Sequence, residues 1–189
     1  MRSRTRIFIA AAVIAVFAVM SAVALATSPH FKKGGTPACT ISGNGTTTVS
    51  AECTGALTGL GFGDLHINTT LTGFAVYQCQ NPSGQHEPAG QNKVLTGPTT
   101  TPNTVPASAV KNGNATFDTN NPVPSLTAAA TVSGTTAGCN NDKWTGVNPS
   151  LTLTDISLTI DQGGPILFTC TASNPGGLTG TVALDGSSC

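Results

Sequence analysis

Apolar and polar residues alternate along residues 64–79, DLHINTTLTGFAVYQC. The odd positions carry Leu65, Ile67 and Leu71, whereas the even positions are mostly polar as far as Thr72. A period of two residues is typical of a β-strand that buries one face in a core. The stretch therefore predicts a half-buried strand that ends at a cysteine.

Gly73 offers two ways to divide this stretch, which is longer than most strands. Either Gly73 marks a β-bulge in one long strand, or Thr72 and Gly73 form a tight turn between two strands. The hairpin is the favoured interpretation. Its buried face would consist of Leu65, Ile67, Leu71, Phe74 and Val76.

Turn signals recur along the rest of the chain. Asn44-Gly45 lies within ACTISGNGTTTVSAEC, residues 38–53, and predicts a hairpin because both turn residues tolerate a positive φ. A second Asn-Gly pair at residues 112–113 predicts another turn. The alternation within residues 151–160 slips by one position, which predicts a bulge near Thr154-Asp155.

Short strands with turn signals about every 8 to 12 residues are typical of a sandwich or barrel. We therefore predict an all-β fold, an immunoglobulin-like or related β-sandwich that disulfides staple, as a single domain over residues 37–189. Residues 27–36, TSPHFKKGGT, predict a short linker before this domain. Residues 80–105 hold four prolines and predict the longest loop, with a short edge strand at residues 93–95. Loops of this length often carry function.

The segment before the linker, residues 1–26, has the three parts of a secretory signal peptide. A positive start leads into an unbroken apolar run and a small-residue cleavage site: Arg2, Arg4 and Arg6, then Ile7–Met20, then Ala24-Leu25-Ala26. The alternative is an uncleaved anchor, because residues 7–26 are just long enough to span a bilayer. Cleavage is the favoured interpretation. It predicts a protein that is secreted or held at the cell surface, with a membrane contact only if the segment is retained.

Charge is scarce after Ala26. The chain has eight basic residues, of which Arg2, Arg4 and Arg6 lie in the signal segment, so five lysines and no arginine remain beside eight acidic residues, a net charge of −3. The same part of the chain is rich in threonine, which suits a pleated surface. A nucleic-acid-binding protein needs a basic patch. We therefore expect no nucleic-acid partner and predict an unidentified protein or a cell-wall component as the partner.

All six cysteines follow the signal segment: Cys39, Cys53, Cys79, Cys139, Cys170 and Cys189. An even number in an exported chain predicts a disulfide framework, and neither a CxxC pair nor a histidine at ligand spacing supports a metal site. Six cysteines allow about 15 pairings. We prefer pairs between sequence neighbours at the two ends of the domain, Cys39–Cys53 and Cys170–Cys189, which leaves Cys79–Cys139.

No catalytic, cofactor-binding or metal-ligating residue is assigned. Asp64 and His66 share a strand face and form a candidate acid–base pair, but no nucleophile accompanies them and solvated side chains are the favoured interpretation. The same holds for His86-Glu87 in the expected loop. Tyr77 and Trp144 are candidates for a sugar-stacking platform, although a core position is favoured for both. Five scattered aspartates lack the spacing of a calcium loop: Asp118, Asp142, Asp155, Asp161 and Asp185.

Four segments stand out along the chain: YQCQNPSGQHEPAGQN (residues 77–92), KNGNATF (111–117), CNNDKW (139–144) and SLTIDQGGPILFTC (157–170). Together they resemble a group of small exported proteins of actinobacteria. In that group a C-x-N-P motif, a later K-N-G-N turn and a tryptophan segment that begins C-N recur in order. The resemblance implies an exported β-sandwich and no particular activity.

The sequence therefore predicts an exported, non-enzymatic β-sandwich protein that acts in binding or adhesion at the cell surface. The first alternative is a secreted protease inhibitor that presents the loop over residues 80–104. The second alternative is a hydrolase whose site the sequence does not reveal.

Overall fold

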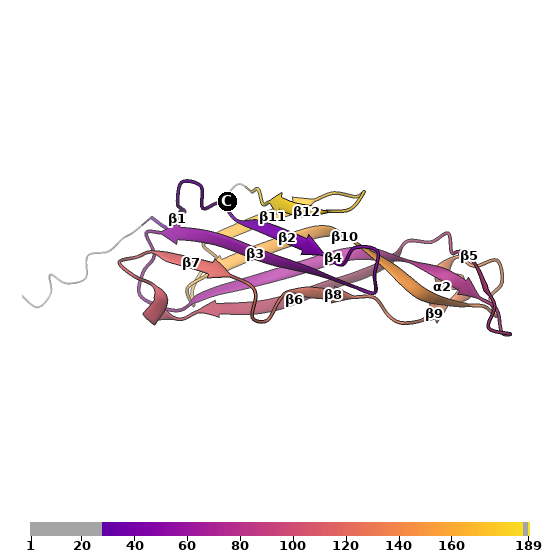
Figure 1. The fold of residues 1–189 in the computed structure, drawn as a ribbon. Helices are drawn as coiled ribbons and strands as arrows, with labels where there is room; N and C mark the ends of the chain where they lie inside the picture. The colour runs from indigo at the N-terminus through magenta and orange to yellow at the C-terminus, as the bar shows by residue number, and fades with distance from the viewer. Residues whose placement is uncertain (1–27, 187–188) are drawn as a thin grey trace, which may run out of the picture.

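The computed structural model describes residues 28–186 and Cys189, without the side chain of Glu87. Two antiparallel sheets face each other, and their longest strands follow the long axis of an elongated molecule (Figure 1). The predicted all-β class is confirmed. The signal peptide expected over residues 1–26 lies outside the described residues.

The first sheet has six strands and is centred on β3 (Thr48–Thr58). Four of the others pair with β3 directly, and β12 pairs with β2. They are β1 (His30–Phe31), β2 (Ala38–Ser42), β7 (Ala115–Asp118), β8 (Ser125–Thr127) and β12 (Gly180–Ala183). The registers place β2 and β1 along one edge of β3, and β8 and β7 along the other.

The second sheet is built on its two longest strands, β4 (Leu65–Gln80) and β10 (Thr145–Asp161). The outer edge of β4 pairs with β6 and β5, and the outer edge of β10 pairs with β11 and β9. These four are β5 (His86–Ala89), β6 (Val94–Val105), β9 (Val132–Ser133) and β11 (Phe168–Ser173).

The strand order is that of an immunoglobulin-like sandwich. In the strand letters of that fold, β2 is strand A, β3 is strand B, and β7 and β8 together are strand E of one sheet. In the other sheet, the neighbouring strands are C′ (β6), C (β4), F (β10) and G (β11). Strand β12 extends the first sheet beyond β2. The inner faces of both sheets form one core, whose largest fully buried aliphatic residues are Leu57, Leu65, Ile67, Leu71, Leu126, Leu151, Leu153, Ile156, Leu158, Ile160 and Leu184.

The hairpin expected at Gly73 is wrong, because β4 continues through this residue. Gly73 pairs with Leu153 on one side and Thr96 on the other, and the register shifts next to it on both neighbouring strands. The single-strand alternative is therefore correct, but the extra residues of the bulges lie on β10 and β6, opposite Gly73, and not in β4. The one on β10 is the bulge expected near Thr154-Asp155. Because the alternation is not reset, Phe74 faces outward, where the Lys93 ammonium lies 4.2 Å from its ring centroid.

The long loop expected over residues 80–105 is also wrong. Most of it is β5 and β6, and β6 pairs with β4 from Val105 back to Val94. Only residues 81–85 and 90–93 remain outside strands. Proline lacks a backbone N–H, so an edge strand with one unpaired side tolerates Pro98 and Pro102.

The linker expected over residues 27–36 is part of the first sheet over its described residues. His30 and Phe31 pair with Thr58 and Leu57, and the Lys32 N–H donates to the Ala56 carbonyl at 2.9 Å. The ring of Phe31 also packs on Phe168 with centroids 4.6 Å apart. An aromatic residue within a polar stretch thus places this segment against the core.

Three disulfides join Cys39 to Cys53, Cys79 to Cys139 and Cys170 to Cys189, the pairing preferred from the sequence. The first connects directly opposed residues of β2 and β3, whose Cα atoms are 3.9 Å apart. The second ties the end of β4 to a segment 60 residues later. Disulfides are rare in the reducing cytosol, so this framework is consistent with an extracellular location.

Candidate functional site

The site lies at the end of the molecule where β4 ends and β10 begins (Figure 1). Residues 128–144, which include the short helix α2 (Gly134–Ala137), close this end of the second sheet. Tyr77 holds residues 128–144 against the sheet, because its side chain is 1% exposed and its hydroxyl donates to the Ala129 carbonyl at 2.9 Å. Burial raises the pKa of the Tyr77 phenol.

Helix α2 places Cys139 next to its disulfide partner, Cys79. Ser133 caps the helix by accepting a hydrogen bond from the Thr136 N–H at 3.1 Å. Gly138 ends it at φ +75°, a left-handed conformation that glycine adopts without steric cost. Cys139 follows at once and bonds to Cys79.

The turn after Cys139 positions Trp144. The Asn141 side-chain oxygen accepts from the Lys143 N–H at 2.9 Å, and the Asn141 carbonyl accepts from the Trp144 N–H at 3.1 Å. The Trp144 carbonyl in turn accepts from the Gly134 N–H at 2.8 Å. The backbone of Trp144 is therefore fixed, while its side chain stays half-exposed.

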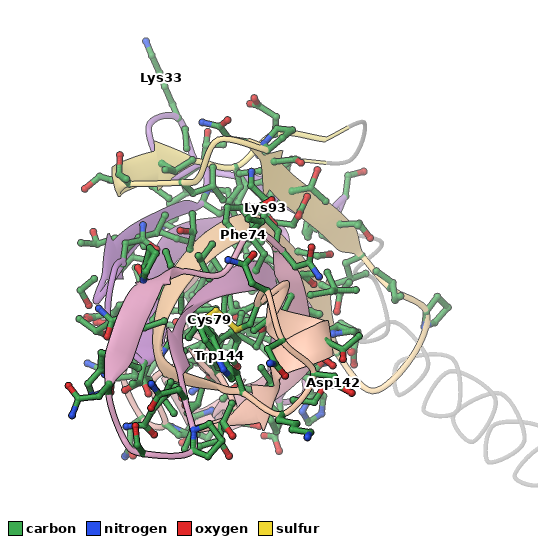
Figure 2. All side chains as sticks on the ribbon, turned by 90° about the vertical axis from the view of Figure 1, so that its right-hand side faces the viewer. Lys33, Phe74, Cys79, Lys93, Asp142 and Trp144 are labelled. Atoms are coloured by element: carbon green, nitrogen blue, oxygen red, sulfur yellow. A yellow bond between two sulfur atoms is a disulfide. The ribbon has the colours of Figure 1, made fainter. Side chains whose placement is uncertain are left out.

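Trp144 borders a shallow depression of about 150 Å³. Figure 2 looks onto this end and places Trp144 and the disulfide at Cys79 near the centre of the face. The other lining residues come from the β5 region and from the segment after α2: Pro88, Ala89, Gln91, Gly138, Cys139 and Asn140.

The polar side chains of the depression are free to bind. Asn92 donates its side-chain amide to the carbonyls of Thr135 and Thr136, at 3.3 and 3.1 Å, and thereby fixes the preceding Gln91 against α2. Within residues 28–186, the side chains of Gln91 and Asn140 and the indole N–H of Trp144 form no hydrogen bond to protein. An aromatic face thus stands beside three groups that can pair with a ligand.

Among the side chains that the structure describes, none that lines the depression is charged. Asp142 and Lys143 are exposed nearby, and Asp142 lies toward the edge of the same face (Figure 2). Amide and indole groups neither take up nor release protons near neutral pH. The arrangement suits the binding of an uncharged, hydroxyl-bearing molecule.

Tyr77 and Trp144 do not form the shared platform that the sequence raised as a candidate. Tyr77 is a core residue, as favoured, whereas the core position favoured for Trp144 is wrong. Trp144 lies in the turn before β10 and so outside the space between the sheets. Sequence reasoning did not identify Gln91 and Asn140, although Asn140 follows a disulfide cysteine directly.

The other candidate residues are not brought together with this site. The Asp64 carboxylate accepts from the Ala107 N–H at 2.8 Å and thus caps the 3-10 turn Ala107–Ala109 at the opposite end. The His66 Nδ1 lies 3.5 Å from the Thr104 hydroxyl. His86 is exposed on β5, and the side chain of Glu87 lies outside the description. Across the described residues, no group of three or more His, Cys, Asp or Glu side chains could hold a metal ion.

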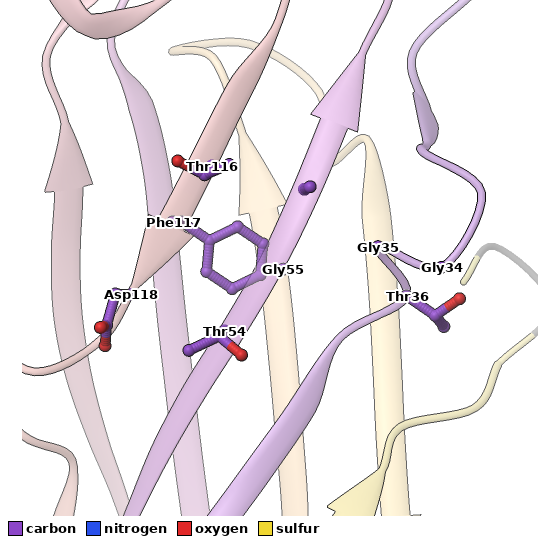
Figure 3. Close-up of a pocket in the computed structure, with 9 residues that line it drawn as sticks. Gly34, Gly35, Thr36, Thr54, Gly55, Thr116, Phe117 and Asp118 are labelled. Atoms are coloured by element: carbon purple, nitrogen blue, oxygen red, sulfur yellow. The ribbon is translucent and has the colours of Figure 1, made fainter.

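A larger depression of about 450 Å³ lies on the first sheet between β7, β3 and the loop at Gly34 (Figure 3). It follows from packing, since a Cβ atom on Gly55 would stand 2.5 Å from the ring of Phe117 on the neighbouring strand. Its only charged group, Asp118, already accepts a hydrogen bond from Asn120 at 3.2 Å. We therefore place the candidate site at Trp144.

No family model, curated protein or solved structure matched this chain in comparisons with known proteins. Among the described residues, no helix is long and apolar enough to cross a membrane.

Proposed function

We propose that this chain is an exported, non-enzymatic binding protein of the cell surface, and that it holds a neutral cell-wall carbohydrate at the Trp144 end. The observation that carries the proposal is the half-exposed Trp144 on a disulfide-anchored turn beside the unpaired side chains of Gln91 and Asn140. The signal-like segment over residues 1–26 and the three disulfides support export.

Sugar rings match the chemistry of this depression. The C–H groups on one face of a pyranose pack on an aromatic ring, and the ring hydroxyls hydrogen-bond to side-chain amides and to an indole N–H. The depression holds about 150 Å³, below the roughly 300 Å³ at which drug-sized pockets begin. It therefore suits a single sugar unit.

Binding at such a site is weak. A sugar unit of roughly 12 non-hydrogen atoms at about −0.3 kcal/mol per atom gives a Kd on the order of a few millimolar. Retention on a wall polymer then depends on many sugar units presented together. This suits adhesion better than capture of a free small molecule.

A pull-down tests the proposal. The chain without residues 1–26 is mixed with insoluble cell-wall polysaccharide, and the bound fraction is measured for the wild type, Trp144→Ala and Phe74→Ala. Phe74 is the matched control because it is a half-exposed aromatic residue of β4 outside the depression. We expect Trp144→Ala to lose retention by about tenfold and Phe74→Ala to keep it. Equal retention of all three proteins would refute the site.

The protease-inhibitor alternative is reduced to two short connections. Of the residues expected to form its loop, 81–85 and 90–93 remain outside strands, and in the first connection the Asn81 side-chain oxygen accepts from the N–H groups of Ser83 and Gln85. Neither this alternative nor the hydrolase alternative has an observation in its favour comparable with the free groups around Trp144.

A further inference from the structure

A second exposed aromatic residue lies at the end of the molecule opposite Trp144. Phe62 occupies the loop between β3 and β4, and 97% of its side chain is exposed. Leu60 of the same loop turns toward the core and is 2% exposed, whereas Phe62 is left outside the packing of this chain.

The loop that carries Phe62 is held on both sides. The Leu60 N–H donates to the Gly113 carbonyl at 3.0 Å. The Gly61 N–H donates to the Gln162 side-chain oxygen at 3.0 Å, and the Gln162 amide returns a bond to the Gly61 carbonyl at 3.3 Å. Phe62 is thus presented to solvent by a fixed backbone.

The loop between β10 and β11 lies at this end too, and it carries a second exposed apolar residue. Ile166, in the loop between β10 and β11, is 61% exposed. Beside Phe62 lies a depression of about 250 Å³, whose lining includes Leu60, Ala107 and Val110. We call Phe62, Val110 and Ile166 the apolar tip.

The course of the chain indicates what the apolar tip meets. Ser28 lies against Gly59, next to the Phe62 loop, so the N-terminal segment joins the domain at this end (Figure 1). The apolar run of residues 7–26 ends two positions before Ser28. The end of the domain that carries the apolar tip is therefore the end at which the described chain begins, next in sequence to this apolar run.

A few exposed apolar side chains suit a lipid surface better than a protein partner. A stable contact between two proteins buries about 1,000 Å² or more with good shape complementarity, whereas a bilayer accepts a few protruding apolar side chains without matched shape. Lys32, Lys33 and Lys111 lie at this end. Asp64 and Asp161 lie there too and accept backbone N–H groups at 2.8 Å, from Ala107 and Gly163 respectively, so this end carries charges of both signs.

We propose that the apolar tip inserts into the surface of a lipid bilayer and holds the molecule with its Trp144 end pointing away from the membrane. The inserted groups are Phe62 and Ile166, and the lysines lie at the level of the lipid headgroups. The ligand is a phospholipid surface, and this contact does not depend on the carbohydrate proposal. It departs from the sequence-based expectation of a membrane contact only if residues 1–26 are retained, because here the domain itself makes the contact.

Vesicle flotation tests the contact. The chain without residues 1–26 is floated with vesicles of phosphatidylcholine, with and without phosphatidylglycerol. We expect the wild type to float with the vesicles, and Phe62→Ser with Ile166→Ser to lower the floated fraction by roughly tenfold. Leu95→Ser is the matched control, because Leu95 is 74% exposed on β6 away from the tip.

Other outcomes of these measurements would refute the proposal or assign the tip to a different partner. A wild type that floats with neither kind of vesicle overturns it, and so does an equal loss in Leu95→Ser. Sedimentation of the wild type and of Phe62→Ser checks the competing occupant: a dimer that Phe62→Ser converts to a monomer would assign the tip to a second copy of the chain. Trp144→Ala should float normally, so failure here and failure of carbohydrate binding are distinguishable.

Discussion

Two buried threonines in the core differ in whether their hydroxyl groups are hydrogen-bonded. Thr69 of β4 and Thr119, which follows β7, are both fully buried. The Thr119 hydroxyl accepts from the Cys53 N–H at 2.8 Å. Within the described chain, the Thr69 hydroxyl oxygen has no hydrogen-bond partner. A buried polar group without a partner costs about 1–3 kcal/mol relative to a satisfied one.

Replacing these two threonines by valine should therefore have opposite effects. Thr69→Val keeps the side-chain shape and removes an unsatisfied hydroxyl, so we expect the free energy of unfolding to rise by about 1 kcal/mol. Thr119→Val leaves the Cys53 N–H unpaired, and we expect a loss of about 1–2 kcal/mol. Urea unfolding at neutral pH measures both. A loss in Thr69→Val as large as that in Thr119→Val would contradict this account of the core.

Tyr77 predicts a dependence of stability on alkaline pH. Because burial raises its pKa in the folded state, the folded chain keeps a proton that the unfolded chain releases near pH 10. The free energy of unfolding should therefore fall as the pH rises above about 10. In Tyr77→Phe, the free energy of unfolding should no longer show the decrease that Tyr77 causes at alkaline pH. At neutral pH it should be lower by about 1 kcal/mol, because the Ala129 carbonyl loses its donor. Identical pH profiles for the two proteins would contradict the assignment.

At the scale of single elements, local sequence signals predicted some features and not others. The Asn112-Gly113 turn needed only local information, and the structure has it, with φ of +50° and +72°. The choice between a turn and a bulge at Gly73 depends on β6 and β10, which lie far away in the sequence. The prolines of β6 read locally as a loop, and only the position of β6 at a sheet edge makes them compatible with a strand.

Gly73 also allows a test of how closely the backbones of β4 and β10 approach each other. A Cβ atom at this position would stand 2.3 Å from the Thr152 carbonyl oxygen, and backbone cannot yield as a flexible side chain does. We expect Gly73→Ala to lower the free energy of unfolding by about 1–3 kcal/mol. Gly164→Ala is the matched control, because a Cβ there meets nothing within 4 Å. Thermal unfolding of both variants checks the difference, and equal melting temperatures would show that β4 and β10 adjust freely.

For the whole molecule, alternation and turn spacing along the full chain predicted the fold class, and the even cysteine count predicted that disulfides form. The pairing was one preference among about 15, and the structure agrees with it. The candidate site was not predictable in the same way. It combines residues 88–91 with residues 138–144, and the Cys79–Cys139 disulfide and the packing of α2 bring them together only in the folded chain.

Two of the three disulfides, Cys79–Cys139 and Cys39–Cys53, should contribute differently to the free energy of unfolding. On the chain-entropy model, the disulfide that closes 60 residues is worth about 4 kcal/mol and the one that closes 14 residues about 3 kcal/mol. We therefore expect Cys79→Ala with Cys139→Ala to cost more than Cys39→Ala with Cys53→Ala in denaturant unfolding. The first pair should also change the fluorescence of Trp144, the only tryptophan of the chain. A larger cost for the second pair would contradict this order.

The central claim is that the Trp144 end binds a neutral sugar, and the single tryptophan makes its fluorescence a direct probe of the site. We propose to titrate the chain without residues 1–26 with soluble oligosaccharides released from cell wall and to record the tryptophan emission. The account predicts a saturable change with a midpoint on the order of millimolar, lost when Gln91 and Asn140 are both replaced by alanine. An emission spectrum that no neutral oligosaccharide alters, or a response that survives the double replacement, would contradict it.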